Sequence, residues 1–424
     1  MKRVFAITVA LLFALLSSFA TDVKLPDVKL DNKDVVVYSW SNYVPQKTYP
    51  WNTFSFVDHY GGNVDTIIAT GDYYQNLYKL ISAGEMIDAS VAEALSFPAL
   101  IMRGLVQPWD NYIDFSDPIW EEVGALDEIE AIRWSDGHIY NISSNSHVLG
   151  VMFYNKRLIE DAGLEDPIEL QKTGEWNWDT FFYYLEELTE DVDGDGITDI
   201  YGIVNTGDFP IAVFSSTGET PIEYKDGVFY NNLRSNTQKD AGNFLYQLMH
   251  SSPRVMSTGD PTSTFLSGKA AFVYTNDYRG YIDYSSMWAS DGLGVVPFPR
   301  YKEDVPQYQA ALVDYFYLME GAENPEGAAL LALSQRYDTL LSVNPKAKDH
   351  NESTKLDFMA HGFTEEAAAS VIEINNMPHK IIWSRSIPIT DGNIEYRAMA
   401  IPWTTLVDSM YGKVDSAIKQ ATNK

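Results

Sequence analysis

The chain has 424 residues, enough for two or three domains of the usual size of roughly 100–200 residues. Its 59 acidic residues outnumber its 30 basic ones, and the formal net charge of −29 excludes nucleic acids and anionic membrane surfaces as partners and argues against a strongly anionic free ligand. There is no cysteine, so disulfides are excluded and stability has to come from the core and from any bound ion.

Residues 1–20 have the pattern of a secretory signal peptide. Lys2 and Arg3 precede an apolar run over residues 4–16, and small residues end the segment at Ala20, where we expect cleavage. The apolar run is too short to span a bilayer. Without a cysteine for lipid attachment, the sequence predicts a free periplasmic protein.

The first third of the chain alternates short β-branched runs with amphipathic stretches. Strands are predicted over 34–40, 65–70 and 87–94, a helix over 73–85, and within 97–114 a helix ended by Gly104 and Pro108. Strands that alternate with helices predict βαβ units around a parallel sheet.

The same alternation restarts after residue 147 and continues to the end of the chain. A strand running into a helix is predicted over 148–164; the later strands are predicted over 199–205, 269–275, 292–299 and 311–320, and the later helices over 176–190, 241–250, 324–341 and 402–424. The pattern therefore favours an α/β protein with two lobes.

Four motifs occur in an order that resembles one family. They are "GHIYNISSNSHVLGVMFYNKRLIEDAGL", "WNWDTF", "DVDGDGITDIYGI" and "FLSGKAAFVYTNDY". Over nearly the whole mature chain the sequence resembles the bacterial extracellular solute-binding proteins of family 1, the maltose-binding-like receptors of ABC importers. One departure is Ile87, where the family usually has proline.

The resemblance implies a two-lobed periplasmic binding protein fold of type II, with the lobes joined by two or three crossover segments. It places the N-terminal lobe at 33–142 and 309–365, and the C-terminal lobe at 148–305 and 375–424. Ligands of open α/β sheets lie beyond the carboxyl ends of the strands, which agrees with a cleft of this kind.

The loop "DVDGDGITDIYG" matches most positions of an EF-hand calcium loop. Oxygen ligands are expected at positions 1, 3, 5, 7 and 9, which are Asp191, Asp193, Asp195, the Ile197 carbonyl and Asp199. The acid expected at position 12 is absent. Structural calcium is favoured over a plain acidic turn, and a catalytic metal is disfavoured because the ligands are all oxygens.

Candidate ligand-binding residues follow the predicted strands of the first lobe. Aromatic rings that pack on C–H surfaces, beside polar groups that bind hydroxyls, are typical of a sugar site. The candidates are Trp40, Asn42, Asp72, Tyr74 and Glu93, with Asn145 and His147 on the first crossover. Trp40 could equally be a core ring, and His147 a hinge residue.

In the second lobe the resemblance supplies most of the candidates. The segments "NTGDFP" and "YTNDYRGY" contribute Asp208, Phe209, Asn276 and Tyr278, and a late helix aromatic of the family corresponds to Trp403. Trp383 and Arg385 are further candidates, because an arginine can bind vicinal hydroxyls or a carboxylate through two hydrogen bonds.

These features predict a monomeric receptor that captures a carbohydrate, foremost an oligosaccharide, by hinge closure and delivers it to the membrane permease subunits of an ABC importer. The alternative is a secreted polysaccharide-degrading enzyme in which Glu93 and Asp208 form a carboxylate pair. A scaffold protein of the dockerin type is disfavoured, because the aspartate loop occurs once. The sequence leaves the sugar open and does not exclude a polyamine or a peptide.

Overall fold

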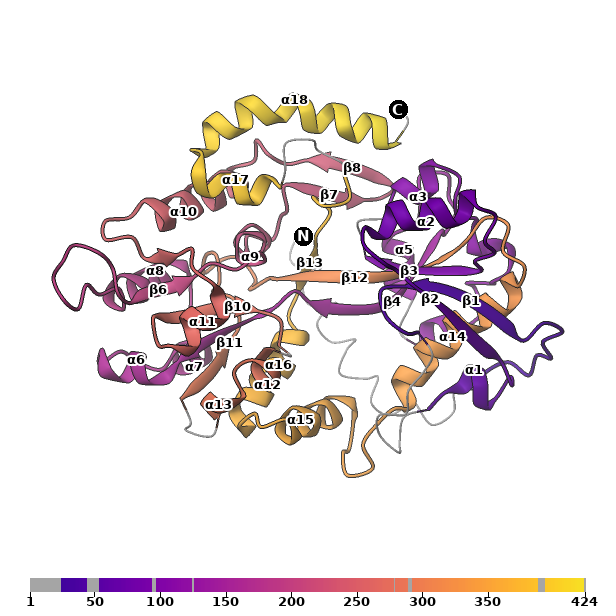
Figure 1. Cartoon of the computed structure of the whole chain (residues 1–424), viewed down its shortest axis with the longest axis horizontal. Helices are drawn as coiled ribbons and strands as arrows, with labels where there is room; N and C mark the ends of the chain where they lie inside the picture. The colour runs from indigo at the N-terminus through magenta and orange to yellow at the C-terminus, as the bar shows by residue number, and fades with distance from the viewer. Residues whose placement is uncertain are drawn as a thin grey trace, which may run out of the picture. The chain divides into compact units, whose positions relative to one another are not determined.

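A computed structural model describes residues 24–43, 53–93, 97–123, 126–277, 279–288, 292–387 and 393–422, without the side chains of residues 93, 144–146 and 281. The predicted signal peptide therefore lies outside the described residues. The described chain divides into two compact units (Figure 1). Unit 1 draws on residues 1–96, 100–145 and 314–353, and unit 2 on residues 97–99, 146–313 and 354–424.

The sheet of unit 1 is built around three parallel strands. The strands are β1 (Asp34–Ser39), β2 (Asn63–Ile68) and β3 (Ala89–Glu93), with β1 between the other two. Val36 pairs with Asp65 and Val37 with Ala89, which fixes the register of this parallel part. The run of three valines in β1 suits a strand buried by neighbours on both sides.

Two further strands pass from one unit to the other along the chain. They are β4 (Asn141–Val148) and β12 (Gln309–Leu318), which pair with each other. In unit 1, residues 314–318 of β12 run antiparallel to β3. In unit 2, residues 309–311 run parallel to β13 (His379–Ile381). The sheet is therefore mixed, whereas the sequence predicted a parallel sheet. The difference arises because β12 pairs with β3 in the antiparallel direction and is not part of a βαβ unit with it.

The helices of unit 1 lie on both sides of these strands; in Figure 1, α2 lies above them and α1 with α14 below. Their bounds are α1 (Ser55–Asp58), α2 (Tyr73–Ser82), α3 (Ala99–Met102), α4 (Ile119–Glu122), α5 (Leu126–Ala131) and α14 (Pro325–Leu341), with a 3-10 turn at Trp109–Asn111. The Trp109 ring stacks on Phe316 of β12 with centroids 5.7 Å apart, and its Nε1 donates to the Phe316 carbonyl at 3.2 Å.

A buried carboxylate joins β1 to the start of α14. Asp88 is 4% exposed and accepts hydrogen bonds from the backbone N–H groups of Val36 at 2.8 Å and Asn324 at 2.7 Å. Asn324 in turn caps α14 by accepting from the Gly327 N–H at 2.9 Å. Pro325 follows the cap at the first helical position, where its missing N–H costs nothing.

The sheet of unit 2 has the strand order β11-β5-β10-β6-β9. The bounds are β5 (Val151–Asn155), β6 (Tyr201–Val204), β9 (Met256–Ser257), β10 (Ala270–Thr275) and β11 (Leu293–Val296). The three strands β10, β6 and β9 are parallel, whereas β5 runs antiparallel to both of its neighbours. A separate hairpin is formed by β7 (Ile222–Lys225) and β8 (Val228–Asn231).

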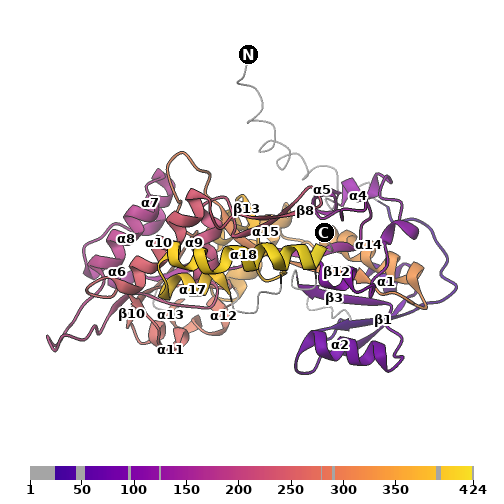
Figure 2. The same ribbon diagram turned by 90° about the horizontal axis from the view of Figure 1, so that it is seen from above.

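The helices of unit 2 end with the longest one, α18 (Trp403–Thr422), which lies beside α17 (Ile394–Ala400) in both views (Figures 1 and 2). The others are α6 (Lys156–Asp161), α7 (Pro167–Thr173), α8 (Trp178–Glu187), α9 (Phe209–Ser216), α10 (Asn236–His250), α11 (Pro261–Leu266), α12 (Arg279–Ile282), α13 (Ser285–Trp288) and α16 (Glu365–Asn375). Helix α15 (His350–Ala360) begins in unit 1 and ends in unit 2. None of the described helices is long and apolar enough to cross a membrane.

The helix predicted within 97–114 is the short α3, and it stops before the two predicted breakers: Gly104 takes a positive φ of 63° and Pro108 is extended. The lobe boundaries implied by the resemblance stay a prediction; in the structure, residues 309–313 and 354–365 group with unit 2.

Candidate functional site

Unit 1 contains a cavity of about 590 Å³ beside the carboxyl end of β1. Ser39 and Trp40 come from the end of β1, Val91 from β3 and Asp314 from β12. The rest of the wall comes from the segment after β1 and the start of α1, from the end of α14 and from the start of α15; it consists of Ser41, Tyr43, Phe54, Gln335, Asp338, Thr339, Ser342 and His350. Ligands in α/β proteins lie at this edge of the sheet.

Trp40 is an exposed aromatic ring at this cavity. Its side chain is 47% exposed, and its ring packs on Tyr73 with centroids 4.4 Å apart and planes tilted by 37°. Tyr73 is itself held by its hydroxyl, which donates to the Val91 carbonyl at 2.6 Å. The indole is therefore supported from behind while much of its surface remains available to a ligand.

Two aspartates line the same cavity in different ways. Asp338 accepts hydrogen bonds from the hydroxyl of Thr53 at 2.9 Å, and from both the hydroxyl and the N–H of Ser55, so it holds the start of α1 against α14. Burial, and to a smaller degree the charge of Asp314, raises the pKa of Tyr43, which lines the cavity, and of Tyr73, which packs behind the Trp40 ring.

The other candidates of unit 1 are distributed around this end of the sheet. Asp72 caps α2 by accepting from the Gln75 N–H at 2.8 Å, and Asn42 is exposed. The Tyr74 hydroxyl is buried, and its ring meets Tyr73 edge-on at 5.2 Å. The side chains of Glu93 and Asn145 lie outside the described part, although the backbone of Glu93 pairs in register with Asp314.

In unit 2, Asp208 and Arg385 form an ion pair. The Arg385 guanidinium donates to the Asp208 carboxylate at 3.3 Å, and both side chains are about one quarter exposed. Burial raises the pKa of Asp208, and the neighbouring guanidinium offsets part of this shift. The Tyr396 hydroxyl sits so close to Gly207 that an added Cβ would lie 2.6 Å from it. Two of the predicted residues are thus brought together in one polar group.

Three aromatic candidates of unit 2 lie in the core. Phe209 is fully buried in α9 and packs on Phe298, with centroids 5.7 Å apart. Trp383 is 4% exposed and packs among Tyr224, Phe229 and Phe97.

Trp403 is 2% exposed. Its ring packs on Phe214, with centroids 5.1 Å apart, and lies where a Cβ on Gly242 would be 2.4 Å away. Phe209, Trp383 and Trp403 thus have little exposed face to offer a ligand in this structure, and their place in the ligand site stays a prediction.

The remaining candidates are placed as follows. Asn276 donates from its Nδ2 to the Leu149 carbonyl at 3.1 Å and is half-buried, and His147 is half-buried near the end of β4. Tyr278 lies outside the described residues.

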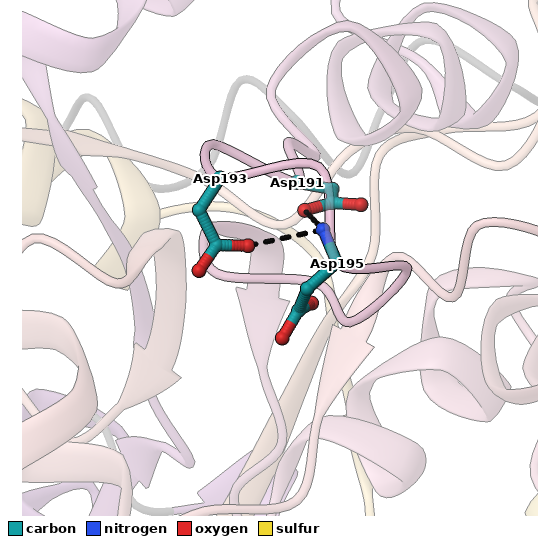
Figure 3. Close-up of side chains that lie close together, drawn as sticks. All are labelled: Asp191, Asp193 and Asp195. Carbon is teal, nitrogen blue, oxygen red and sulfur yellow. Dashed lines mark hydrogen bonds between the residues drawn. The ribbon is translucent and has the colours of Figure 1, made fainter.

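The aspartate loop brings together three of its predicted ligands (Figure 3). Carboxylate oxygens of Asp191, Asp193 and Asp195 lie within 4.8 Å of one another, and all three residues are exposed. The Asp199 carboxylate is not in this cluster and accepts from the Val192 N–H at 2.9 Å. The Ile197 side chain is 65% exposed, and its N–H donates to Asp195 at 2.7 Å.

The backbone of the loop is already turned around one carboxylate. Asp191 accepts from the N–H groups of Gly194 at 2.8 Å, Asp195 at 3.2 Å and Gly196 at 2.8 Å. Both glycines take a positive φ, of 73° and 86°, which a tight loop of this kind requires. Three converging carboxylates offer the all-oxygen donors that calcium prefers.

Sequence reasoning missed several residues of the unit 1 cavity, above all Asp314, Tyr43 and Gln335. Asp314 carries the same signal that singled out Glu93, since it is a charged residue inside an apolar strand. Tyr43 and Gln335 have no such signal, because each lies in a segment whose polar residues are ordinary for a loop or a helix.

Comparisons with known proteins identify the fold. Three similar solved structures are UspC of Mycobacterium tuberculosis, the cyclic α-maltosyl-1,6-maltose binding protein of Arthrobacter globiformis, and the substrate-binding protein Lmo0181 of Listeria monocytogenes in complex with cycloalternan. Their identities to this chain are 17%, 15% and 16%, and their TM-scores 0.62, 0.61 and 0.53. They cover 91%, 92% and 93% of this chain, and 100%, 100% and 98% of their own. The chain therefore has the mixed α/β fold of a two-lobed periplasmic binding protein.

Among curated proteins no sequence matches. The family model described as "Bacterial extracellular solute-binding protein" matches residues 26–332, which is most of the chain. Members of this family are receptors that bind a solute and carry out no reaction on it, so the alternative of a polysaccharide-degrading enzyme is set aside. The chain belongs to the bacterial extracellular solute-binding proteins.

Proposed function

We propose that this receptor binds a carbohydrate, foremost an oligosaccharide, and delivers it to the permease subunits of an ABC importer. The proposal includes export by the signal peptide at residues 1–20, a monomer free in the periplasm, and capture of the ligand by hinge closure. It is supported by the family, and by two proteins of similar structure, one in complex with cycloalternan and the other a cyclic α-maltosyl-1,6-maltose binding protein.

The observation that carries the proposal is the exposed Trp40 ring at the cavity of unit 1. Sugars present flat C–H surfaces that pack on indoles, and hydroxyl groups that need planar polar partners. The cavity offers the ring together with the side chains of Gln335, Ser39 and Asp314. Within unit 2 we propose the Asp208–Arg385 group, Asn276 and His147 as ligand-binding residues.

A thermal-shift screen over a panel of neutral, acidic and amino-bearing oligosaccharides tests this function. A ligand that binds only the native state at 100 times its dissociation constant adds about 2.7 kcal/mol of stability, which is readily seen as a higher melting temperature. Polyamines and peptides are screened beside the oligosaccharides. If only polyamines or peptides raise the melting temperature, the carbohydrate assignment is contradicted.

Replacing Trp40 by alanine is expected to weaken binding of the ligand found in this way by about 1–3 kcal/mol. Because the ring is 47% exposed, the melting temperature of the unliganded protein should change little. Isothermal titration calorimetry measures the first effect and a melting curve the second. The exposed Tyr183 of α8 provides a matched control, since Tyr183→Ala removes an equally exposed ring that does not line the cavity.

We also propose that the aspartate loop binds calcium as a structural ion. The Asp191, Asp193 and Asp195 carboxylates would hold it, the Ile197 carbonyl would be a further oxygen donor, and Asp199 would stabilise the loop through Val192. The loop joins the end of α8 to β6 through the antiparallel bridge between Glu190 and Ile200. The ion would therefore stabilise the connection between α8 and β6, and its role would be structural.

Chelation is expected to lower the melting temperature of the native protein, because the ion stabilises only the folded loop. Asp193→Ala should remove this sensitivity, whereas Glu303→Ala, which changes an exposed acid elsewhere in unit 2, should leave it intact. Melting curves with and without chelator, and with calcium restored, measure the effect. Identical curves for the native protein in chelator and in calcium would show that the loop is only an acidic turn.

A further inference from the structure

Phe54 is a half-buried ring in the wall of the unit 1 cavity, and the inference about it rests on the function proposed above. It lies one residue before α1 and lines the cavity from there. Phe56, two residues later, is fully buried and belongs to the hydrophobic core of unit 1. Of the two phenylalanines in this segment, Phe54 is therefore the one that is open to the cavity.

The residues on both sides of Phe54 are bound to one carboxylate. The Thr53 hydroxyl donates to one oxygen of Asp338 at 2.9 Å, and the Ser55 N–H donates to the other oxygen at 2.9 Å. The Ser55 hydroxyl donates to the same carboxylate, and the Thr53 N–H donates to the Ser342 hydroxyl at 3.3 Å. Asp338 belongs to the last turn of α14, and Ser342 follows it. The backbone of Phe54 is thus held against the end of α14 from both sides.

This anchor is needed because α1 is too short to fix Phe54 by itself. The helix has four residues, and isolated helices shorter than about 12–15 residues are marginal in water. The Phe54 carbonyl accepts from the N–H groups of Val57 at 3.1 Å and Asp58 at 2.7 Å, so Phe54 moves with the helix. Asp338 is 8% exposed, and hydrogen bonds to a carboxylate in such a place are strong. Its position therefore determines where the Phe54 ring lies.

We infer that Phe54 is a ligand-contacting ring of the unit 1 cavity, and that Asp338 is the positioning residue that holds it there. A sugar would pack a C–H face on Phe54 as it does on Trp40. Trp40 follows β1 and Phe54 precedes α1, so two separate segments each place a ring at the same cavity. A ring that is already held in place loses less conformational entropy when the sugar binds. Asp338 acts through this ring, because its oxygens accept from the residues beside Phe54.

The first test removes the ring. Maltotetraose, cellotetraose and xylotetraose are titrated calorimetrically into the full-length mature protein, and the tightest binder is the probe; if none binds, the best oligosaccharide of the screening panel takes its place. Phe54→Ala should weaken the binding of the probe by about 10-fold or more, as expected for a ring on which a sugar packs. Phe115→Ala is the matched control, since Phe115 is a half-buried phenylalanine of unit 1 that does not line this cavity.

The second test separates positioning from a purely structural role by a double-mutant cycle. Asp338→Ala should weaken the binding of the probe by about 3-fold or more when Phe54 is present, and should have no further effect in Phe54→Ala. Asp88→Ala removes another buried carboxylate of unit 1, and should lower the melting temperature without changing the affinity. Thr53→Val removes only one of the anchoring hydrogen bonds, and gives the same comparison if Asp338→Ala fails to fold.

The outcomes separate the inference from the function on which it rests. An unchanged affinity in Phe54→Ala overturns the role of the ring. An equal loss of affinity on removing the Asp338 carboxylate with and without the Phe54 ring, or no loss in either case, overturns the positioning role. The carbohydrate receptor stands in all these cases. If neither the three tetrasaccharides nor any oligosaccharide of the screening panel binds the native protein, the carbohydrate function fails and the inference fails with it.

Discussion

Trp403→Ala is expected to lower the free energy of unfolding by about 3–5 kcal/mol, because it empties a site that a whole indole fills at the start of α18. Gly242 of α10 packs directly against this ring. Removing the ring therefore leaves a cavity between α10 and α18, which can be refilled only if the two helices repack. Chemical denaturation of the unliganded protein measures the loss. Ligand binding at a temperature where the variant is still folded should be unchanged, since the ring has almost no exposed surface.

Trp40→Ala is the matched comparison for this experiment, because it removes the same side chain from an exposed position. The two variants should show opposite patterns, with Trp403→Ala affecting stability and Trp40→Ala affecting binding. Normal stability together with lost binding in Trp403→Ala would mean that the ring meets the ligand after all.

Asp88→Ala is expected to cost about 2–6 kcal/mol of stability. The substitution leaves the partly buried N–H of Val36 and the buried N–H of Asn324 without their acceptor, and each such group carries a penalty of about 1–3 kcal/mol. Denaturant titration measures the effect. It should appear in unit 1, where these groups join β1 to the start of α14.

Asp65→Ala serves as the control for Asp88→Ala, because Asp65 is an exposed acid on the neighbouring strand β2. Its removal should change the free energy of unfolding by no more than about 0.5 kcal/mol. If both variants lose the same small amount, the hydrogen bonds of Asp88 contribute little, and α14 is held by packing alone.

The strands and the longer helices were predictable because their signals are local. The valine run of β1 and the Asn324–Pro325 start of α14 specify their elements within a few residues. The helix α16 was missed, although Thr364 caps it by accepting from the Ala367 N–H at 3.2 Å. The pairing of β12 with β3 was not predictable, since nothing local distinguishes an antiparallel neighbour from a parallel one.

The candidate site was predicted less completely, for a physical reason. An aromatic residue at the end of a strand or the start of a helix is equally suited to the core and to a ligand. Trp40 follows β1 and Trp403 begins α18, and their opposite exposures are set by the segments that pack on them. For Trp403 that partner is Gly242, more than 160 residues earlier in the chain.

The large sequence separation between β3 and its partner β12 affects the order in which the two sheets can form. Asp314 pairs with Glu93 and Leu318 with Ala89, so unit 1 lacks this strand until more than 220 further residues have been synthesised. All five strands of the unit 2 sheet lie between residues 151 and 296. Pairings between distant segments form slowly, because the intervening loop has to be closed first. The five-stranded sheet of unit 2 can therefore form before the sheet of unit 1 has all its strands, although unit 1 begins the sequence and unit 2 ends it. Strands β1, β2 and β3 wait for their antiparallel neighbour while the chain is made, which leaves this part of the chain open to an export machinery.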